Sequence, residues 1–281
     1  MKKKGVYDRV TASVKAAGLE VVERGGLKPN PRFSLVQEGI ALCKRENIAF
    51  ILAVGGGSTI DSAKAIGVGG LYQGSDFWQC FMGKDSFTQT LPVGVVLPIP
   101  AAGSESSGDS VITNEEGWFK RPLKSELIFP KFALINPEIY YTLPPYQTAC
   151  GSADIMSHLM ERYFTDVPNV DATDRMIEAL LRTMIYYAPR AIAQPDNYDI
   201  WAEISWAGTV AHNGLLDKGR IGDWASHRNE HEIGGLHEIT HGGGLAIVTP
   251  SWMRFLFHRP LSRLLQLGTP VFDRALSPIV L

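Results

Sequence analysis

Hydrophobic residues recur along the chain in two patterns, short continuous runs and helical spacing. Residues 50–54 form an apolar run with β-branched Ile51 and Val54, which is typical of a buried strand. Other short apolar runs predict further strands at 19–23, 92–100, 111–113 and 132–135. Apolar residues at helical spacing predict two amphipathic helices in the same part of the chain, over 5–17 and 34–46.

From Pro144 onward, helical spacing dominates. The segments that show it are 147–164, 172–192, 199–215 and 222–233, with a last one beginning over 261–267. This change predicts an α/β domain over residues 1–144, followed by an all-α domain over 145–281. An α/β sheet normally begins with a strand, whereas this chain begins with a helix, so we expect its first strand to be missing.

Three glycines, at 55–57, connect the strand at residue 50 to the next predicted helix. Ser58, with Asp61 three residues later, matches a capping box at the start of that helix. A strand, a glycine loop and a helix N-terminus can bind phosphate, because glycines allow close approach to free N–H groups. The same pattern also fits an ordinary capped turn, and the loop by itself leaves both interpretations open.

Composition narrows the class of protein. Of the 281 residues 45% are hydrophobic and 20% charged, which is a globular balance, and the net charge of −2 shows no footprint for nucleic acid. The three cysteines are scattered, which predicts a reducing compartment without disulfides. We find no signal peptide and no membrane-spanning run, so we predict a cytoplasmic protein that binds neither membrane nor nucleic acid.

Histidines cluster late in the chain. Asp154 and His158 are four residues apart, as are His227 and His231, and residues four apart share one helix face. His241 follows a pair of glycines, so it can lie on another element and complete a site. Histidines with one carboxylate suit Fe(II) or Zn(II) better than Mg(II) or Ca(II). We interpret Glu232, Glu238, His212 and His258 as solvated or packing residues.

A metal ion beside a nucleotide loop indicates one chemistry in particular. The ion would bind an alcohol or aldehyde oxygen and polarise it. A nicotinamide would then take or give the hydride, and the protein would only position it.

Four segments carry a resemblance to a known family, namely AVGGGSTIDSAKAIG, IPAAGSESSGDSVIT, LPPYQTACGSADIMSHLMERYF and HGGGLAIVTP. Together they resemble the iron-containing (group III) alcohol dehydrogenases, in the branch of NADPH-dependent butanol dehydrogenases and aldehyde reductases. The resemblance covers about residues 5–267. It implies a Rossmann-like α/β domain followed by a helical metal-binding domain, with the site in the cleft between them.

The resemblance also implies roles for individual residues. The positions that match metal ligands are Asp154, His158, His227 and His241. His231 matches a catalytic residue beside the substrate that helps to relay protons, and His237 has no assigned role. The positions that match cofactor contacts are Asn30, Gly56, Gly57, Ser58, Asp61 and Lys120. The implied cofactors are Fe(II) or Zn(II) and NADP(H), with NAD(H) as the alternative. The implied partner is a small alcohol or aldehyde. The resemblance leaves open whether the chain forms a homodimer.

Members of the family begin with a strand and a second glycine loop and continue through more helices, so we expect this chain to be truncated at both ends. Two alternatives to an active alcohol dehydrogenase follow. One is a catalytically impaired relative that binds only metal. The other is an enzyme of the glycerol dehydrogenase or dehydroquinate synthase type.

Overall fold

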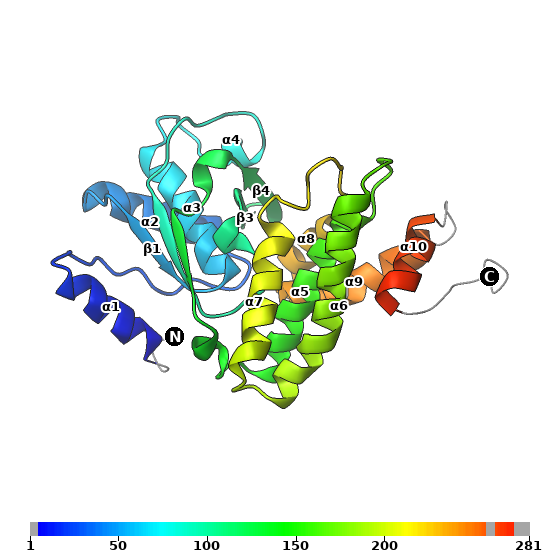
Figure 1. The fold of residues 1–281 in the computed structure, drawn as a ribbon. Helices are drawn as coiled ribbons and strands as arrows, with labels where there is room; N and C mark the ends of the chain where they lie inside the picture. The colour runs from blue at the N-terminus through cyan, green and yellow to red at the C-terminus, as the bar shows by residue number, and fades with distance from the viewer. Residues whose placement is uncertain (1–4, 257–261, 273–281) are drawn as a thin grey trace.

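The computed structural model describes residues 5–256 and 262–272, and it consists of an α/β part and a helical part (Figure 1). The helices of the first part are α1 (Val6–Ala16), α2 (Phe33–Arg45), α3 (Gly57–Leu71) and α4 (Trp78–Phe81). Its strands are β1 (Ile51–Val54), β2 (Val93–Leu97), β3 (Asp109–Asn114), β4 (Phe119–Lys124) and β5 (Phe132–Ile135). The second part contains α5 (Pro145–Tyr163), α6 (Asp171–Ala193), α7 (Tyr198–His212), α8 (Ala225–His237), α9 (His241–Leu256) and α10 (Ser262–Phe272). The predicted fold class is confirmed, while the exact domain limits stay a prediction.

Strand β2 lies between β1 and β5 in a parallel sheet, with Val95 opposite both Ala53 and Ala133. All of β2 is buried, as expected for a central parallel strand. Helix α3 packs against β1 and β2. Because parallel strands end at the same sheet edge, the loops after β1 and β2 lie together, and such an edge is where open α/β sheets bind ligands.

The predicted strand at 19–23 is wrong. Among the described residues this segment pairs with no strand, and Leu19 is 61% exposed. An apolar run becomes a strand only where a neighbouring strand can take its hydrogen bonds, and local pattern does not show whether such a neighbour exists.

Strands β3 and β4 form a separate antiparallel pair, in which Val111 lies opposite Pro122. The sequence predicts only part of β3 and none of β4, because a proline within a run counts against a strand. The pair packs β3 against α3 and β4 against α8. It therefore connects the α/β part to the helices.

Helix α5 is the centre of the helical part and packs against α6, α7, α8 and α9. Its buried Ile155 and Leu159 join an apolar cluster with Leu181 of α6 and Trp201 of α7. The helices predicted at 147–164, 172–192, 199–215 and 222–233 correspond to α5 through α8, with shifted ends. Helix α9 is absent from the prediction, because its three glycines at 242–244 indicate a loop.

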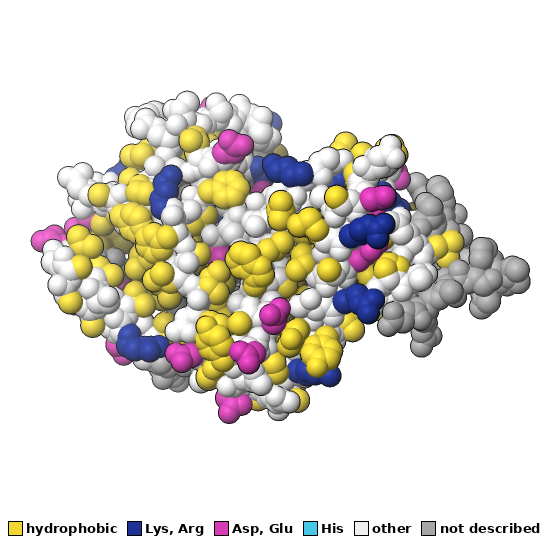
Figure 2. Space-filling model, viewed as in Figure 1, with side chains coloured by type: hydrophobic (Ala, Val, Ile, Leu, Met, Phe, Trp, Pro, Cys, Tyr) yellow, Lys and Arg dark blue, Asp and Glu magenta, His cyan; other side chains and the backbone are white. Residues whose placement is uncertain are grey.

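The face seen in Figure 2 carries many hydrophobic side chains (yellow). Exposed large hydrophobic residues at the sheet include Phe50, Phe132 and Leu134, and the rings of Phe50 and Phe132 stack with centroids 5.9 Å apart. Within the described ranges, none of the helices has the length and apolar character needed to cross a membrane.

Candidate metal and cofactor site

One cavity of about 750 Å³ is lined by residues of both parts of the molecule. The α/β part contributes Gly56, Gly57 and Asp61 to its wall, and the helical part contributes Asp154 and His227. The predicted glycine loop and the predicted metal residues therefore face the same space.

The glycine loop lies at the start of α3, but the predicted capping box is wrong. Helix α3 begins at Gly57 with Gly56 as its N-cap, and no side chain caps it. Ser58 lies inside the first turn, and Asp61 binds other groups. A Cβ atom on Gly56 would lie 2.7 Å from Cγ2 of Ile99, so the loop needs a glycine here. An uncapped helix N-terminus beside a cavity supports the phosphate interpretation.

Asp61 and Lys64 form a closed polar network behind this loop. The Asp61 carboxylate accepts hydrogen bonds from the Ser104 hydroxyl at 2.6 Å and from the main-chain N–H of Val111 at 3.0 Å. Lys64 Nζ donates to three main-chain oxygens at 2.6–2.8 Å. Burial lowers the pKa of Lys64 to about 8 and raises that of Asp61. Asp61 thus fixes the wall of the cavity with both of its oxygens.

Three side chains from three helices converge on the other side of the cavity. They are Asp154 within α5, His227 near the start of α8, and His241 at the start of α9. The Nε2 atoms of the two histidines lie 3.8 and 3.9 Å from Oδ1 of Asp154. One potential ligand atom of each residue lies within 4.8 Å of the other two. Ligands about 2 Å from a shared ion are separated by distances of this order.

The donor atoms of this group fit a cation. His227 Nε2 is buried without a hydrogen-bond partner in the part of the chain that the structure describes, and the buried Oδ1 of Asp154 has Nδ1 of His158 at 3.0 Å. Burying a nitrogen without a partner costs free energy, and a cation between this nitrogen and the carboxylate removes that cost. A carboxylate with imidazole nitrogens suits Zn(II) or Fe(II).

His158 lies beside this group without joining it. Its Nδ1 is hydrogen bonded to the main-chain oxygen of Asp154 and lies 3.0 Å from Oδ1. Its ring centroid is 4.3 Å from that of His227. The structure therefore groups three of the four predicted ligands and places the fourth in contact with them.

Burial and neighbouring charges set the protonation of these groups. Burial works against ionisation of Asp154, but His158 and His241 outweigh it and hold the Asp154 pKa well below its usual range. Burial and repulsion by His227 lower the pKa of His158 to about 4. Burial also acts to lower the pKa of His227, but its contacts with Asp154 and Glu161 raise it overall. At neutral pH His158 has therefore already lost its proton, whereas His227 holds its proton more tightly and a metal ion has to compete with that proton.

Two buried glutamates that sequence reasoning missed hold the outward nitrogens of the histidines. Glu161 Oε1 accepts a hydrogen bond from the main-chain N–H of His227 at 2.8 Å and lies 3.1 Å from its Nδ1. Glu230 Oε2 contacts Nδ1 of His241. Spacing could have found both, because Glu161 follows Asp154 by two helical turns and Glu230 follows His227 by three residues.

His231 follows His227 by one turn of α8 and lines the cavity. Burial and the positive charge of Lys120 hold the pKa of His231 well below its usual range. With Glu230 and His241, it forms a second group of potential ligand atoms. His237, the last residue of α8, is exposed.

Asn30 and Lys120 line the same cavity and contact each other. Lys120 Nζ donates hydrogen bonds to Asn30 Oδ1 and Glu230 Oε2, each at 3.1 Å. Asn30 Nδ2 donates to the main-chain oxygens of Gly234 at 3.3 Å and Ile239 at 3.1 Å. Both residues therefore connect the α/β part to the end of α8.

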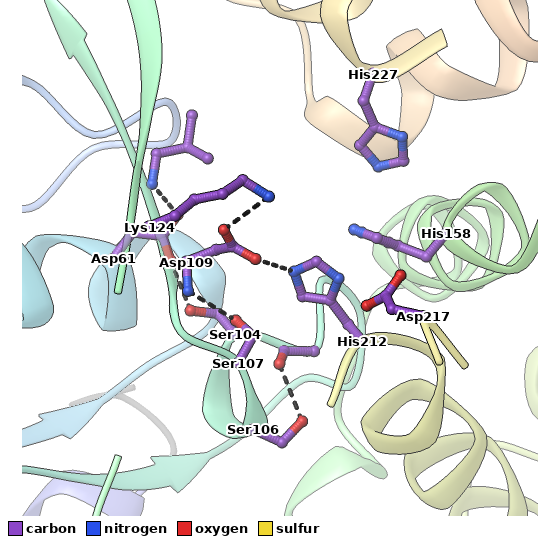
Figure 3. A network of polar contacts seen from close by, with 12 residues as sticks. Asp61, Ser104, Ser106, Ser107, Asp109, Lys124, His158, His212, Asp217 and His227 are labelled. Carbon is purple, nitrogen blue, oxygen red and sulfur yellow. Dashed lines mark hydrogen bonds and ion pairs between the residues drawn. The ribbon is translucent and has the colours of Figure 1, made fainter. Parts of the chain in front are cut away.

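His212 is a buried packing residue that also joins a polar network. Its Nε2 lies 3.3 Å from Oδ2 of Asp109 (Figure 3), and its Nδ1 faces Arg162 at 2.9 Å. The other Asp109 oxygen pairs with Lys124 at 3.0 Å. These partners come from distant parts of the chain, so local pattern could not reveal them. Glu232 and Glu238 are exposed as predicted, and His258 lies outside the described residues.

Two protein-family models match this chain. The model described as iron-containing alcohol dehydrogenase matches residues 1–137. The model for the C-terminal part of the Fe-containing alcohol dehydrogenase family matches residues 148–278. The chain belongs to the iron-containing alcohol dehydrogenase family. The predicted family is thereby confirmed, as is the prediction of an NAD(P)-dependent enzyme of the alcohol dehydrogenase type.

Relatives of this alcohol dehydrogenase match nearly all of it. The "Probable NADH-dependent butanol dehydrogenase 1" of Bacillus subtilis is 45% identical over 273 residues, which are 97% of this chain and 70% of the relative. The "NADPH-dependent aldehyde reductase YqhD" of Escherichia coli is 36% identical, with the same two coverages. The crystal structure of NADH-dependent butanol dehydrogenase A from Thermotoga maritima is 40% identical with a TM-score of 0.94, over 98% of this chain and 69% of that one. The chain thus spans about 70% of the length of these relatives.

Proposed function

We propose that this alcohol dehydrogenase family member is a metal-dependent oxidoreductase that interconverts primary alcohols and aldehydes by hydride transfer with NADP(H). One observation carries the proposal. The grouped ligand atoms of Asp154, His227 and His241, with Nε2 of His227 buried and unpartnered among the described residues, lie beside the same cavity as an uncapped glycine-loop helix. The names of two relatives, butanol dehydrogenase and aldehyde reductase, support the substrate class.

The residues that would hold the metal are Asp154, His158, His227 and His241. When bound, Fe(II) or Zn(II) supplies Lewis-acid polarisation of the alcohol or carbonyl oxygen. Both metals accept this set of ligands, so metal analysis is needed to choose between them.

The other residues of the cavity bind and orient. The residues that would bind the pyrophosphate are Gly56, Gly57 and Ser58, at the start of α3. Asp61 keeps the wall beside the nicotinamide in place, and Asn30 with Lys120 would contact the cofactor from the α8 side. A ring nitrogen of His231 would relay a proton between the substrate oxygen and solvent.

The proposal also includes a preference for NADP(H) over NAD(H). The relatives carry both cofactors in their names, NADH in Bacillus subtilis and NADPH in Escherichia coli. Fluorescence titration with both reduced cofactors tests it. Tighter binding of NADH by about tenfold, or about 1.4 kcal/mol, would replace NADP(H) with NAD(H).

The test of the function combines metal analysis with turnover. We expect about one Fe or Zn per chain, the ratio of a single four-ligand site, and oxidation of NAD(P)H on addition of a short aldehyde. His241→Ala should lose the metal, and full metal content in that variant would remove His241 from the ligands. Bound metal without turnover would favour the relative that only binds metal. Turnover of glycerol without turnover of linear alcohols would favour the glycerol dehydrogenase type.

A further inference from the structure

Glu230 is a buried carboxylate between a candidate metal ligand and a cofactor-side lysine. Its side chain is fully buried, and that of Lys120 is 4% exposed. Glu230 Oε2 contacts Nδ1 of His241 and lies 3.1 Å from Nζ of Lys120. A buried carboxylate is costly unless it is paired, and both of its partners, His241 and Lys120, line the cavity.

The contact with Glu230 decides which nitrogen of His241 faces the metal group. Because Nδ1 faces Glu230, Nε2 faces Oδ1 of Asp154. His227 shows the same arrangement, with Nδ1 at 3.1 Å from Glu161 and Nε2 toward Asp154. Two imidazoles on different helices are therefore oriented alike by carboxylates. Such carboxylate partners fix the tautomer of a metal-binding histidine and increase its basicity.

We propose that Glu230 is a positioning residue that orients His241 toward the metal and connects it to Lys120 on the cofactor side of the cavity. The inference rests on the proposed function, because it takes the metal to bind at the four candidate ligands Asp154, His158, His227 and His241. Removing the charge of Glu230 should weaken metal binding although every metal ligand stays in place.

A rival arrangement makes Glu230 a ligand itself. Glu230, His231 and His241 also bring one potential ligand atom each within 4.8 Å of one another. In that case His231 would be needed for metal binding. In the arrangement that we propose, His231 is dispensable for it.

The experiment compares Glu230→Gln with Glu232→Gln in the full chain. Glu232 lies two residues further along α8, and its side chain is 57% exposed in an ion pair with Arg121. Zn(II) dissociation constants are measured by competition with a chromophoric chelator. We expect Glu230→Gln to weaken Zn(II) binding by about 10–100-fold and Glu232→Gln to leave it unchanged. Equal dissociation constants for the two variants would overturn the proposal.

Two further measurements separate positioning from folding and from direct ligation. Co(II) bound to Glu230→Gln should show a shifted visible absorption spectrum, which a loss of folding stability alone would not produce. An unshifted spectrum would count against a positioning role. His231→Ala should retain Zn(II), and a loss as large as that in Glu230→Gln would favour the rival arrangement. Wild-type protein that binds no Zn(II) would overturn the proposed function and this inference together, whereas normal binding by both wild type and Glu230→Gln would overturn the inference alone.

Discussion

Two buried polar networks face the same cavity from opposite sides, and they differ in how completely their atoms are paired. On the α/β side, both oxygens of Asp61 accept hydrogen bonds and Lys64 donates to three main-chain oxygens. On the helical side, His227 Nε2 is buried without a hydrogen-bond partner in the described residues, and it lies 3.8 Å from Oδ1 of Asp154. We call the first network closed, because its charged groups are paired, and the second open, because it contains a buried atom without a partner.

The difference indicates that the closed network maintains the fold and that the open network binds a ligand. A fully paired network stabilises one arrangement of the backbone and keeps the glycine loop in place without help from a ligand. An unpaired buried atom lowers stability, and it is retained where a ligand completes it. Substitutions should therefore affect folding on one side of the cavity and metal binding on the other.

Asp154→Ala should have the largest effect, because it removes the oxygen that faces both His227 and His241. We expect Zn(II) affinity to fall by more than about 100-fold. Loss of a residue that only supports a metal ligand already costs about 10–100-fold in affinity. Chelator competition measures the affinity, and urea unfolding of the metal-free protein serves as the control. A variant that keeps wild-type affinity would show that the open network is not the metal site.

The pH dependence of folding stability tests the role of Lys64 in the closed network. Burial lowers its pKa to about 8 in the fold from the ordinary 10.5. Between these two values the unfolded chain keeps a proton that the folded chain has lost. Stability contributed by Lys64 should therefore rise with pH across this window, by up to about 3 kcal/mol.

Urea unfolding of the wild type and Lys64→Met, at several pH values across the window, measures this contribution. The methionine variant should be less stable near neutral pH, because the main-chain oxygens lose their donor, and should lack the rise. Parallel pH profiles for the two proteins would contradict the assignment.

Gly242→Ala tests how the open network is assembled. A Cβ atom here would lie 1.9 Å from the main-chain oxygen of Cys150, so α9 would have to move away from α5. Because the residue follows His241, both stability and metal affinity should fall, stability by about 1–3 kcal/mol. Gly243→Ala is the matched control, since its nearest contact is the hydroxyl of the exposed Tyr146. Equal thermal unfolding of the two variants would count against this close packing.

His237→Ala should have the smallest effect. The residue is exposed at the end of α8, away from both networks. We expect unfolding free energy to stay within about 0.5 kcal/mol of wild type, with unchanged metal content. Lost metal would show that the open network extends to the end of α8.

Much of the fold follows from local pattern. The apolar runs of β1, β2 and β5 and the helical spacing of α5 to α8 are strong periodic signals, and they correspond to observed elements. The failures have physical causes. Pro122 counts against a strand where β4 forms, and the glycines at 242–244 indicate a loop where α9 forms. The run at 19–23 has no strand to pair with among the described residues.

The residue types and their spacing were enough to indicate a glycine loop before a helix and a set of histidines with one aspartate. Such signals are local, since they depend on which residues share a helix turn or follow a strand. Spacing within helices could not show that Asp154, His227 and His241 meet while His158 stays beside them. It also could not show that Glu230 lies between His241 and Lys120, or that His212 reaches Asp109. These pairings join residues far apart in the chain, so they depend on how α5, α8 and α9 pack against one another and against the β3–β4 pair.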